Sequence, residues 1–361
     1  MRGLFFVVAA LTGVLARQPA APEIAYDADA NFLKLPENVY FGEVAGVAVN
    51  SQGHVFAFSR GGTVGPAYGA AAAQLFEFDK NGNFVREIAR NLYAFSYAHA
   101  VRVDPQDNIW VVDKGSDMIV KLTPQGRVAL VFGRKKEASD EAVPWTRVTP
   151  PRPHVNGQFR QPTDVTWDPQ GNVFISDGYI NSRVAKFDKS GDWVKSWGEK
   201  GTKEGEFDTP HSIASDARGN IYVADRGNRR IQVFTPDGVF QRTISVAAVP
   251  VPPDAKPAIG NPIPAEATGT QAPGAPWAIC ITPGPRQILY SADAYPGRIY
   301  KLTLEGTLLG VLGEAGKQLK QFGWIHEIAC PSENELYVAE VLNWRVQKLI
   351  LRPGQETAMV R

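Results

Sequence analysis

Short apolar runs alternate with polar turns along most of this chain, in units of one design. Each unit has an apolar run, a turn such as DPQGN, and a second run in which apolar and polar residues alternate. Alternation with a period of two is typical of β-strands, and an Asp/Gly/Asn turn between two such runs indicates a hairpin. The six units begin with the stretches 45–60, 99–113, 163–177, 211–225, 277–293 and 326–340.

These repeats predict an all-β fold, a six-bladed β-propeller. Most units continue into a third and a fourth strand, and four strands per unit at a period of roughly 50 to 65 residues is the propeller signature. The last unit stops after its third strand (345–351), whereas LKLPENVYF (33–41) precedes the first unit. We therefore expect an N-terminal strand to complete the last blade and close the ring. The Pro-rich stretches 134–159 and 246–275 are expected to be rim loops.

The first residues have the composition of a secretion signal. One Arg precedes a nearly unbroken apolar run that ends in Val14-Leu15-Ala16, which suits signal peptidase. We expect a signal peptide at 1–16, a flexible segment at 17–32, one propeller domain at 33–355 and a tail at 356–361. The mature protein is expected to be secreted or periplasmic. No later stretch approaches the roughly 20 apolar residues of a membrane span, so we expect no membrane anchor.

Charge and cysteine content exclude several classes of protein. The 38 basic and 37 acidic residues nearly cancel and are interspersed, which argues against a nucleic-acid partner. The 2 cysteines, Cys280 and Cys330, are too few for a disulfide framework. We expect both cysteines to be free thiols, with a single disulfide between them as the alternative. We also expect the protein to be a monomer.

Histidines recur at one phase of the repeat. The residue fourteen positions before the end of each second strand, allowing for two inserted residues in the fifth unit, is Gly46, His99, Thr163, His211, Trp277 or His326. An isolated His is more often a hydrogen-bonded core residue. However, first strands line the channel of a propeller, so His99, His211 and His326 are predicted to converge on its axis. Three imidazoles and one open position match a catalytic zinc site.

The ends of the second strands mark a second ring of positions. The residues there are Arg60, Asp113, Asp177, Asp225, Asp293 and Glu340. We expect the five acids to cap turns through backbone N–H groups, whereas Arg60 breaks the rule. Lys114, Tyr179 and Arg226 follow shortly after the acids and are expected on the same rim as the His ring. Arg is suited to hold a carboxylate in a bidentate fork.

Several stretches resemble a known family. QPTDV (161–165), SDGYINSRV (176–184), WGEKGTKEGEFDTPHSIA (197–214) and VADRGNRRIQVF (223–234) are similar to the NHL-repeat catalytic core of peptidyl-α-hydroxyglycine α-amidating lyase. The match is dense from about 160 to 235 and looser over 44–133 and 320–350. The resemblance implies a six-bladed propeller that cleaves the N–Cα bond of a C-terminal α-hydroxyglycine and gives a peptide amide and glyoxylate.

The resemblance also implies roles for individual residues. His99, His211 and His326 match the zinc ligands, Tyr179 and Arg226 the catalytic Tyr and Arg, and Arg60 the other active-site Arg. A structural calcium in the family is held by two backbone carbonyls and an Asp, at positions matched here by Val47, Val101 and Glu327. Two departures stand out: Glu327 replaces that Asp, and Trp324 replaces an active-site Met. We expect Trp324 and Lys114 to line the substrate pocket.

We therefore predict a zinc-dependent lyase acting on a peptide or small molecule with a C-terminal α-hydroxyglycine. Zinc acidifies the hydroxyl, Tyr179 takes its proton with Arg226 nearby, and Arg60 holds the carboxylate. One alternative is a non-catalytic NHL propeller that binds a peptide or cell-wall ligand, because fold alone does not set function. Another is a different metal-dependent propeller enzyme, a lactonase or a streptogramin-type lyase, although carboxylate-rich sites would suit those better.

Overall fold

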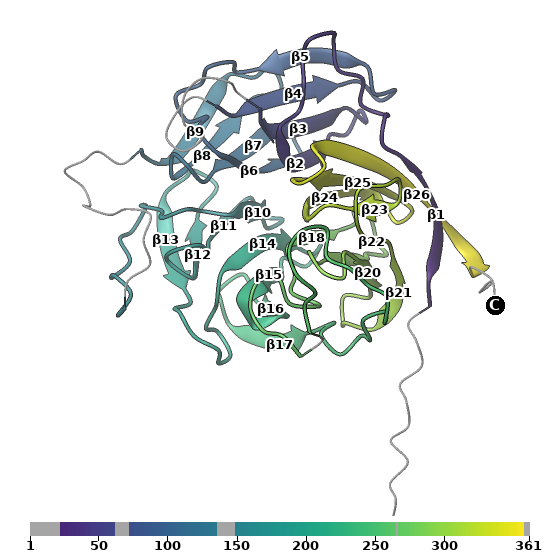
Figure 1. Ribbon diagram of the computed structural model, residues 1–361. Coiled ribbons are helices and arrows are strands. Elements are labelled where there is room, and N and C mark those ends of the chain that lie inside the picture. The colour runs from purple at the N-terminus through teal and green to yellow at the C-terminus, as the bar shows by residue number, and fades with distance from the viewer. Residues whose placement is uncertain (1–21, 62–71, 136–148, 265, 357–361) are drawn as a thin grey trace, which may run out of the picture.

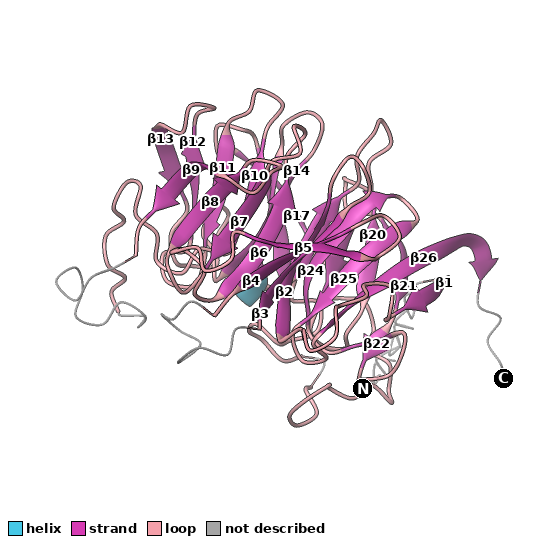
Figure 2. Ribbon diagram, turned by 90° about the horizontal axis from the view of Figure 1, so that it is seen from above, coloured by secondary structure: helices cyan, strands magenta, loops and turns pink. Residues whose placement is uncertain are grey.

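The alternating runs form strands, and the strands form six four-stranded antiparallel sheets around a central axis (Figure 1). The computed structural model describes residues 22–61, 72–135, 149–264 and 266–356. Within these residues the one helical element is a single 3-10 turn, η1 (Arg226–Asn228), and nearly all regular structure is strand (Figure 2). The predicted six-bladed all-β propeller is confirmed. The expected signal peptide at 1–16 lies outside the described residues.

In blades one to three the strands follow one another from the channel outward. Blade one is β2 (Glu43–Val49), β3 (Val55–Arg60), β4 (Gln74–Phe78) and β5 (Phe84–Ile88). Blade two is β6 (Ala98–Val103), β7 (Ile109–Asp113), β8 (Met118–Leu122) and β9 (Val128–Gly133). Blade three is β10 (Asp164–Trp167), β11 (Val173–Asp177), β12 (Arg183–Phe187) and β13 (Trp193–Trp197).

Blades four and five repeat this order, and a two-stranded parallel pair follows them. Blade four is β14 (Pro210–Ser215), β15 (Ile221–Asp225), β16 (Arg230–Phe234) and β17 (Phe240–Ile244). Blade five is β18 (Ala278–Ile281), β19 (Leu289–Ala292), β20 (Ile299–Leu302) and β21 (Leu308–Leu312). The parallel pair is β22 (Glu314–Ala315) and β23 (Gln321–Phe322).

Blade six is built from both ends of the chain. Its strands are β24 (Ile325–Ser332), β25 (Glu335–Glu340), β26 (Arg345–Glu356) and, on the outside, the N-terminal β1 (Ile24–Asp29), which lies along β26 in Figure 1. The predicted closure by an N-terminal strand is therefore confirmed. The closing strand is 24–29 rather than the 33–41 run, and it lies within the segment expected to be flexible. Tyr26, the buried residue of β1, packs between blades five and six, which explains this choice.

The core consists of six hydrophobic clusters, and each lies between two neighbouring blades. The second strand of a blade, such as β7 or β11, is buried at every residue, because it is covered on both faces. Outer strands such as β5 and β9 expose much of their length. Blade-to-blade packing of this kind holds the inner strands, and the residues on them, in fixed positions around the channel.

The turns between first and second strands are held by their own side chains. In blade three, Asp168 Oδ1 accepts backbone N–H groups from Gln170 (3.0 Å) and Asn172 (2.9 Å). Gly171 adopts a φ of 85°, which favours glycine. Asp104 and Asp216 close the corresponding turns in the same way.

The expectation of free thiols is wrong. Cys280 on β18 and Cys330 on β24 form a disulfide, with their Cα atoms 6.3 Å apart. The first strands of blades five and six lie side by side in the ring, which brings together two residues 50 positions apart in sequence. The separation of the two cysteines along the sequence did not predict this contact.

The described parts of the Pro-rich stretches 134–159 and 246–275 contain no strand. The second of them is fixed to the propeller by Arg229, which donates to the carbonyls of Pro273 (2.8 Å) and Ala267 (2.8 Å). Across the described ranges, the chain forms no helix with the length and apolar character needed to cross a bilayer.

Candidate functional site

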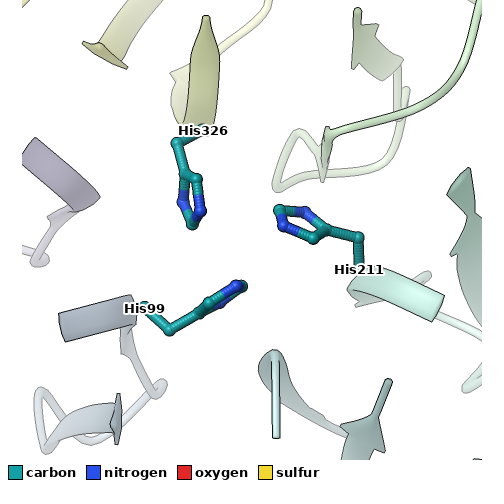
Figure 3. Close-up of side chains that lie close together, drawn as sticks. All are labelled: His99, His211 and His326. Atoms are coloured by element: carbon teal, nitrogen blue, oxygen red, sulfur yellow. The ribbon is translucent and has the colours of Figure 1, made fainter. Parts of the chain in front are cut away.

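Three histidines meet at one end of the central channel. His99, His211 and His326 project from the first strands of blades two, four and six, and their rings converge on a common point (Figure 3). The ring centroids lie 4.8, 4.5 and 4.9 Å apart, so the triangle is nearly equilateral. One nitrogen from each ring lies within 4.8 Å of the other two, and all three side chains are buried.

Each histidine is aimed at the axis by a β-bulge. The ladder between first and second strands skips one residue in these blades, between Ala98 and Ala100, between Pro210 and Ser212, and between Ile325 and Glu327. The skipped residue is the histidine each time. A bulge re-aims the side chain of its extra residue. The repeat phase located these residues in sequence, but it did not predict the bulge.

The same register corrects the assignment of the first blade by one residue. There the skipped residue is Ala45, and not Gly46, and it is Ser59 that occupies the place of the acids. Ser59 Oγ accepts the N–H of Gly42 (3.0 Å), just as Asp225 accepts that of Asp208 (2.7 Å). Arg60 therefore does not replace a capping acid. It lies one residue beyond, in the place that Lys114 takes in blade two.

A backbone carbonyl of the next blade orients each imidazole. The Nδ1 atoms of His99, His211 and His326 lie 2.5, 2.6 and 2.8 Å from carbonyl oxygens of Thr163, Trp277 and Ala45. An Nδ1–H that donates to a carbonyl leaves Nε2 as the lone-pair nitrogen, and this second contact is typical of metal-binding histidines. All three Nε2 atoms can therefore act as donors to one ion.

The histidines are held in the neutral form that a metal requires. Burial lowers the pKa of each imidazole well below its usual value, and nearby charges lower it further. For His211 the main neighbour is Arg226, and for His326 it is Arg60. Among the described residues these three form the one group of His, Cys, Asp or Glu side chains that is close enough to hold a metal.

Tyr179 brings a phenol to the same point. Its O–H donates to His211 Nε2 (3.0 Å) and lies 3.3 Å from His99 Nε2. Burial by itself raises the pKa of a phenol, but the positive charges of Arg226, Lys114 and Arg60 outweigh it and lower the pKa of Tyr179 below its usual value. The ammonium of Lys114 lies 3.6 Å from the centre of the Tyr179 ring.

Lys114, Tyr179 and Arg226 occupy equivalent places on the rim. The backbone N–H of each donates to the carbonyl two residues before the ring position of its own blade, at Tyr97, Gln161 and Thr209, respectively. In blade one, Arg60 pairs in the ladder with the equivalent residue, Glu43. Blades one to four thus place three cations and a phenol around the histidines, and the sequence prediction that these residues share one face is met.

Arg60 and Arg226 are both held against aromatic rings. Arg60 donates to the Ala98 carbonyl (2.8 Å) and to Glu43 (2.6 Å), and its guanidinium lies 4.0 Å from the centre of the Tyr97 ring. The guanidinium of Arg226 lies 4.4 Å from the Trp277 ring. Sequence reasoning missed Tyr97, because the equivalent residues of the other blades, Glu43, Gln161 and Thr209, are not aromatic.

An aromatic wall completes the site on the side of blades five and six. The Trp277 and Trp324 rings lie 5.3 Å apart, and Trp277 also contacts the His211 ring at 5.5 Å. The Trp277 indole N–H donates to the Thr270 carbonyl (2.6 Å), so the 246–275 stretch supports this wall. Trp324, which was expected to line the pocket, therefore forms this wall together with Trp277.

The residues expected to hold calcium do not fit such a site. The backbone N–H groups of Val47 and Val101 donate to Glu327 Oε2 at 2.8 and 3.1 Å, so donors rather than oxygen ligands face that carboxylate. Arg102 Nε lies 2.9 Å from the other oxygen, Glu327 Oε1. A calcium site requires several oxygen ligands around the ion, whereas a guanidinium already lies against this acid.

Comparison with known proteins supports the same repeats. The NHL repeat family matches residues 207–234. The chain is 31% identical over 246 residues to peptidyl-glycine alpha-amidating monooxygenase of Mus musculus, covering 61% of this chain and 23% of that protein. It is 24% identical over 282 residues to peptidyl-alpha-hydroxyglycine alpha-amidating lyase 1 of Drosophila melanogaster, covering 72% of this chain and 45% of that protein. The chain thus spans less than half of either relative.

Solved structures support the fold. A streptogramin B lyase structure superposes with a TM-score of 0.54 at 14% identity, covering 91% of this chain and 98% of that one. At this level of identity, the likeness concerns the propeller and not its chemistry.

Proposed function

We propose that this chain, which carries an NHL repeat and is similar to peptidyl-α-hydroxyglycine α-amidating lyases, cleaves the N–Cα bond of a peptidyl-α-hydroxyglycine or a similar carbinolamide. The products would be an amide and glyoxylate. The observation that carries the proposal is the phenol of Tyr179 within hydrogen-bond distance of two of three converging, neutral imidazoles. A propeller that only binds a ligand has no need of this arrangement.

The three histidines fit a catalytic zinc. They offer three neutral nitrogens from rigid strands and leave a fourth position for an oxygen of the substrate, which is the usual composition of catalytic zinc sites. Zinc bound there would act as a Lewis acid that lowers the pKa of a hydroxyl group. The carbonyls of Thr163, Trp277 and Ala45 keep the ring nitrogens turned toward the axis.

Tyr179 is the proposed general base. Its oxygen lies beside the histidine nitrogens, within hydrogen-bond reach of a hydroxyl group bound next to them, and Arg226 and Lys114 would stabilise the negative phenolate. The phenolate takes the hydroxyl proton, the oxygen electron pair forms the aldehyde C=O, and the C–N bond breaks toward nitrogen. The nitrogen then takes the proton back from Tyr179, so the reaction needs no net acid or base.

The surrounding residues set the orientation of the substrate. Arg60 is pre-positioned by Glu43 and Tyr97, and it is the proposed partner of the substrate carboxylate. Trp277 and Trp324 form an apolar wall at blades five and six, where the acyl or peptide part would pack. We therefore propose that the substrate binds with its carboxylate toward blade one and its acyl group toward blades five and six.

Tyr179→Phe tests the proposal directly. With N-benzoyl-α-hydroxyglycine as substrate and glyoxylate release as the readout, we expect kcat to fall about 100-fold to 10,000-fold, because a positioned base contributes on this order. The matched control is Tyr40→Phe, which removes the hydroxyl of an exposed tyrosine and should leave the rate unchanged. An undiminished rate in Tyr179→Phe would refute the base role. A wild-type protein that releases no glyoxylate, with or without added zinc, would refute the proposed reaction.

A further inference from the structure

A buried cluster of charges crosses the channel directly beneath the histidines. Arg102 on β6 donates to both carboxylate oxygens of Asp164 on β10, from Nε at 2.9 Å and from Nη2 at 2.6 Å. Its Nε also lies 2.9 Å from Glu327 Oε1 on β24. Asp164 and Glu327 are almost fully buried. Glu327 follows His326 in the chain, so the cluster begins one residue below the metal-binding ring.

This cluster touches the first strand of every blade. Asp164 Oδ2 accepts from Ser212 Oγ (2.8 Å) of blade four, and Glu327 Oε2 accepts from the backbone of Val47 (2.8 Å) in blade one. Arg102 also donates to the Ile279 carbonyl of blade five at 3.4 Å. Together with blades two, three and six, which supply Arg102, Asp164 and Glu327, all six inner strands take part. The cluster therefore lies on the axis of the ring.

Glu327 packs closely against the backbone of blades one and two. A Cβ added to Gly46 would lie 2.8 Å from Glu327 Oε2 and 2.7 Å from the Val101 nitrogen. The carboxylate is thus packed against backbone on one side and against Arg102 on the other. A divalent cation there would face a guanidinium and two N–H donors, all of which repel it.

We propose that the guanidinium of Arg102 is the axial cation of this propeller, in the place where the resemblance implies calcium, so that the six blades are joined there by an internal ion-pair cluster and need no divalent ion. One charged side chain supplies what a bound ion would otherwise supply: a positive centre between carboxylates of different blades. Its planar fork suits the bidentate contact with Asp164. This inference concerns stability and does not rest on the proposed reaction.

The first test is calcium itself. The whole chain is dialysed into calcium-free buffer at constant zinc, its calcium content is measured by elemental analysis, and its Tm is recorded with and without millimolar calcium. We expect well under one equivalent of bound calcium and a Tm that added calcium does not change. One tightly bound equivalent, or a Tm that rises by several degrees with calcium, would overturn the proposal.

The second test removes the cation. Arg102→Met keeps much of the side-chain volume and leaves two buried carboxylates without their counter-charge, so we expect a Tm lower by roughly 5–15 °C. Arg102→Lys keeps the charge without the fork and should lose less. The matched control is Arg218→Ala, whose side chain is 68% exposed and should leave the Tm unchanged. An Arg102→Met protein as stable as wild type would contradict the proposal.

A double-mutant cycle separates the ion pair from general packing. Arg102→Met and Asp164→Asn are measured singly and together, and the double variant should lose clearly less stability than the two losses added, because each single variant leaves the partner charge unpaired. Strict additivity would contradict the pairing. If Arg102→Met fails to fold, Asp164→Asn and the calcium measurement on the wild-type protein still decide the outcome. Loss of lyase activity affects none of these readouts.

Discussion

The two ends of the central channel are lined by the same six first strands, yet their polar side chains are engaged in different ways. At the far end, Asp104, Asp168 and Asp216 accept the backbone N–H groups of their own turns. At the near end, each histidine donates from Nδ1 to the neighbouring blade and turns Nε2 to the axis. The first arrangement completes a turn, whereas the second leaves a ligand atom directed at a shared point.

The size of a cavity does not indicate at which end the histidine site lies. A cavity of about 690 Å³ opens at the far end, lined by the turn acids and by Arg102, and none of the three histidines lines it. The arrangement of the polar groups is therefore a better guide to the site than the volume of the hollow. The Arg102 cluster lies between the two ends, which implies that the substrate would enter and leave at the histidine end.

The largest expected effect comes from removing one histidine. His211→Ala should lower kcat/KM by about 1,000-fold or more, because a Lewis acid contributes several kcal/mol to catalysis. It should also lower the zinc content measured after dialysis. His54→Ala is the matched control, since His54 pairs with Glu77 outside the ring and should leave both values unchanged. Full zinc occupancy in His211→Ala would show that the three histidines are not the binding site.

The acids at the two ends should respond to pH with opposite signs. Burial raises the pKa of Asp293, at the end of the second strand of blade five, to about 6. The folded protein therefore binds more protons than the unfolded chain, whose Asp pKa is about 3.9, and the free energy of unfolding falls by roughly 2 kcal/mol as the pH rises from 4 to 6.

Denaturant unfolding at pH 4, 5, 6 and 7 measures this contribution, which Asp293→Asn should remove. The far-end acid Asp104 is the comparison. Burial raises its pKa, but hydrogen bonds from Trp110 and Asn108 outweigh burial and lower it overall. The contribution of Asp104 is therefore lost as the pH falls below the usual carboxyl pKa. Parallel pH curves for wild type and Asp293→Asn would contradict the assignment.

A smaller effect, on binding, is expected from Arg60. Arg60→Met should raise KM about 10-fold to 100-fold for an α-hydroxyglycine substrate, because a hydrogen bond to a charged group contributes about 1.5–3 kcal/mol. Its effect on kcat should be smaller. The informative comparison uses a substrate whose carboxylate is replaced by a primary amide. For this substrate, the wild-type protein and the variant should have similar KM values. A KM that stays at the wild-type value for the acid would exclude Arg60 as the carboxylate partner.

The smallest effect is expected from a far-end turn. Asp168→Ala should cost about 1–2 kcal/mol of unfolding free energy, because it removes the acceptor for two backbone N–H groups. Activity should stay within about twofold of wild type, since the substitution lies at the end of the channel away from the histidines. Steady-state kinetics beside denaturant unfolding checks both parts, and a large loss of activity at unchanged stability would place function at the far end.

The repeated design of the blades could be predicted from the amino-acid sequence alone. Strand alternation and turn residues are local, so six blades, their order and closure by an N-terminal strand could be predicted from periodicity. The phase of the repeat also found His99, His211 and His326, because equivalent positions in a propeller lie on one ring. The capping of turns by Asp113, Asp177, Asp225, Asp293 and Glu340 was predictable for the same reason, and hydrogen bonds confirm it.

The contacts between neighbouring blades could not be predicted in this way and became visible in the folded protein. The bulge that re-aims each histidine moves the first-blade equivalent from Gly46 to Ala45. The disulfide of Cys280 and Cys330, the burial of Tyr26 in β1 and the contacts of Arg102 all join residues from different blades or chain ends. A repeat pattern records the distance between equivalent residues along the chain. It carries no record of which side chains touch across the channel, because that depends on register, bulges and packing around the closed ring.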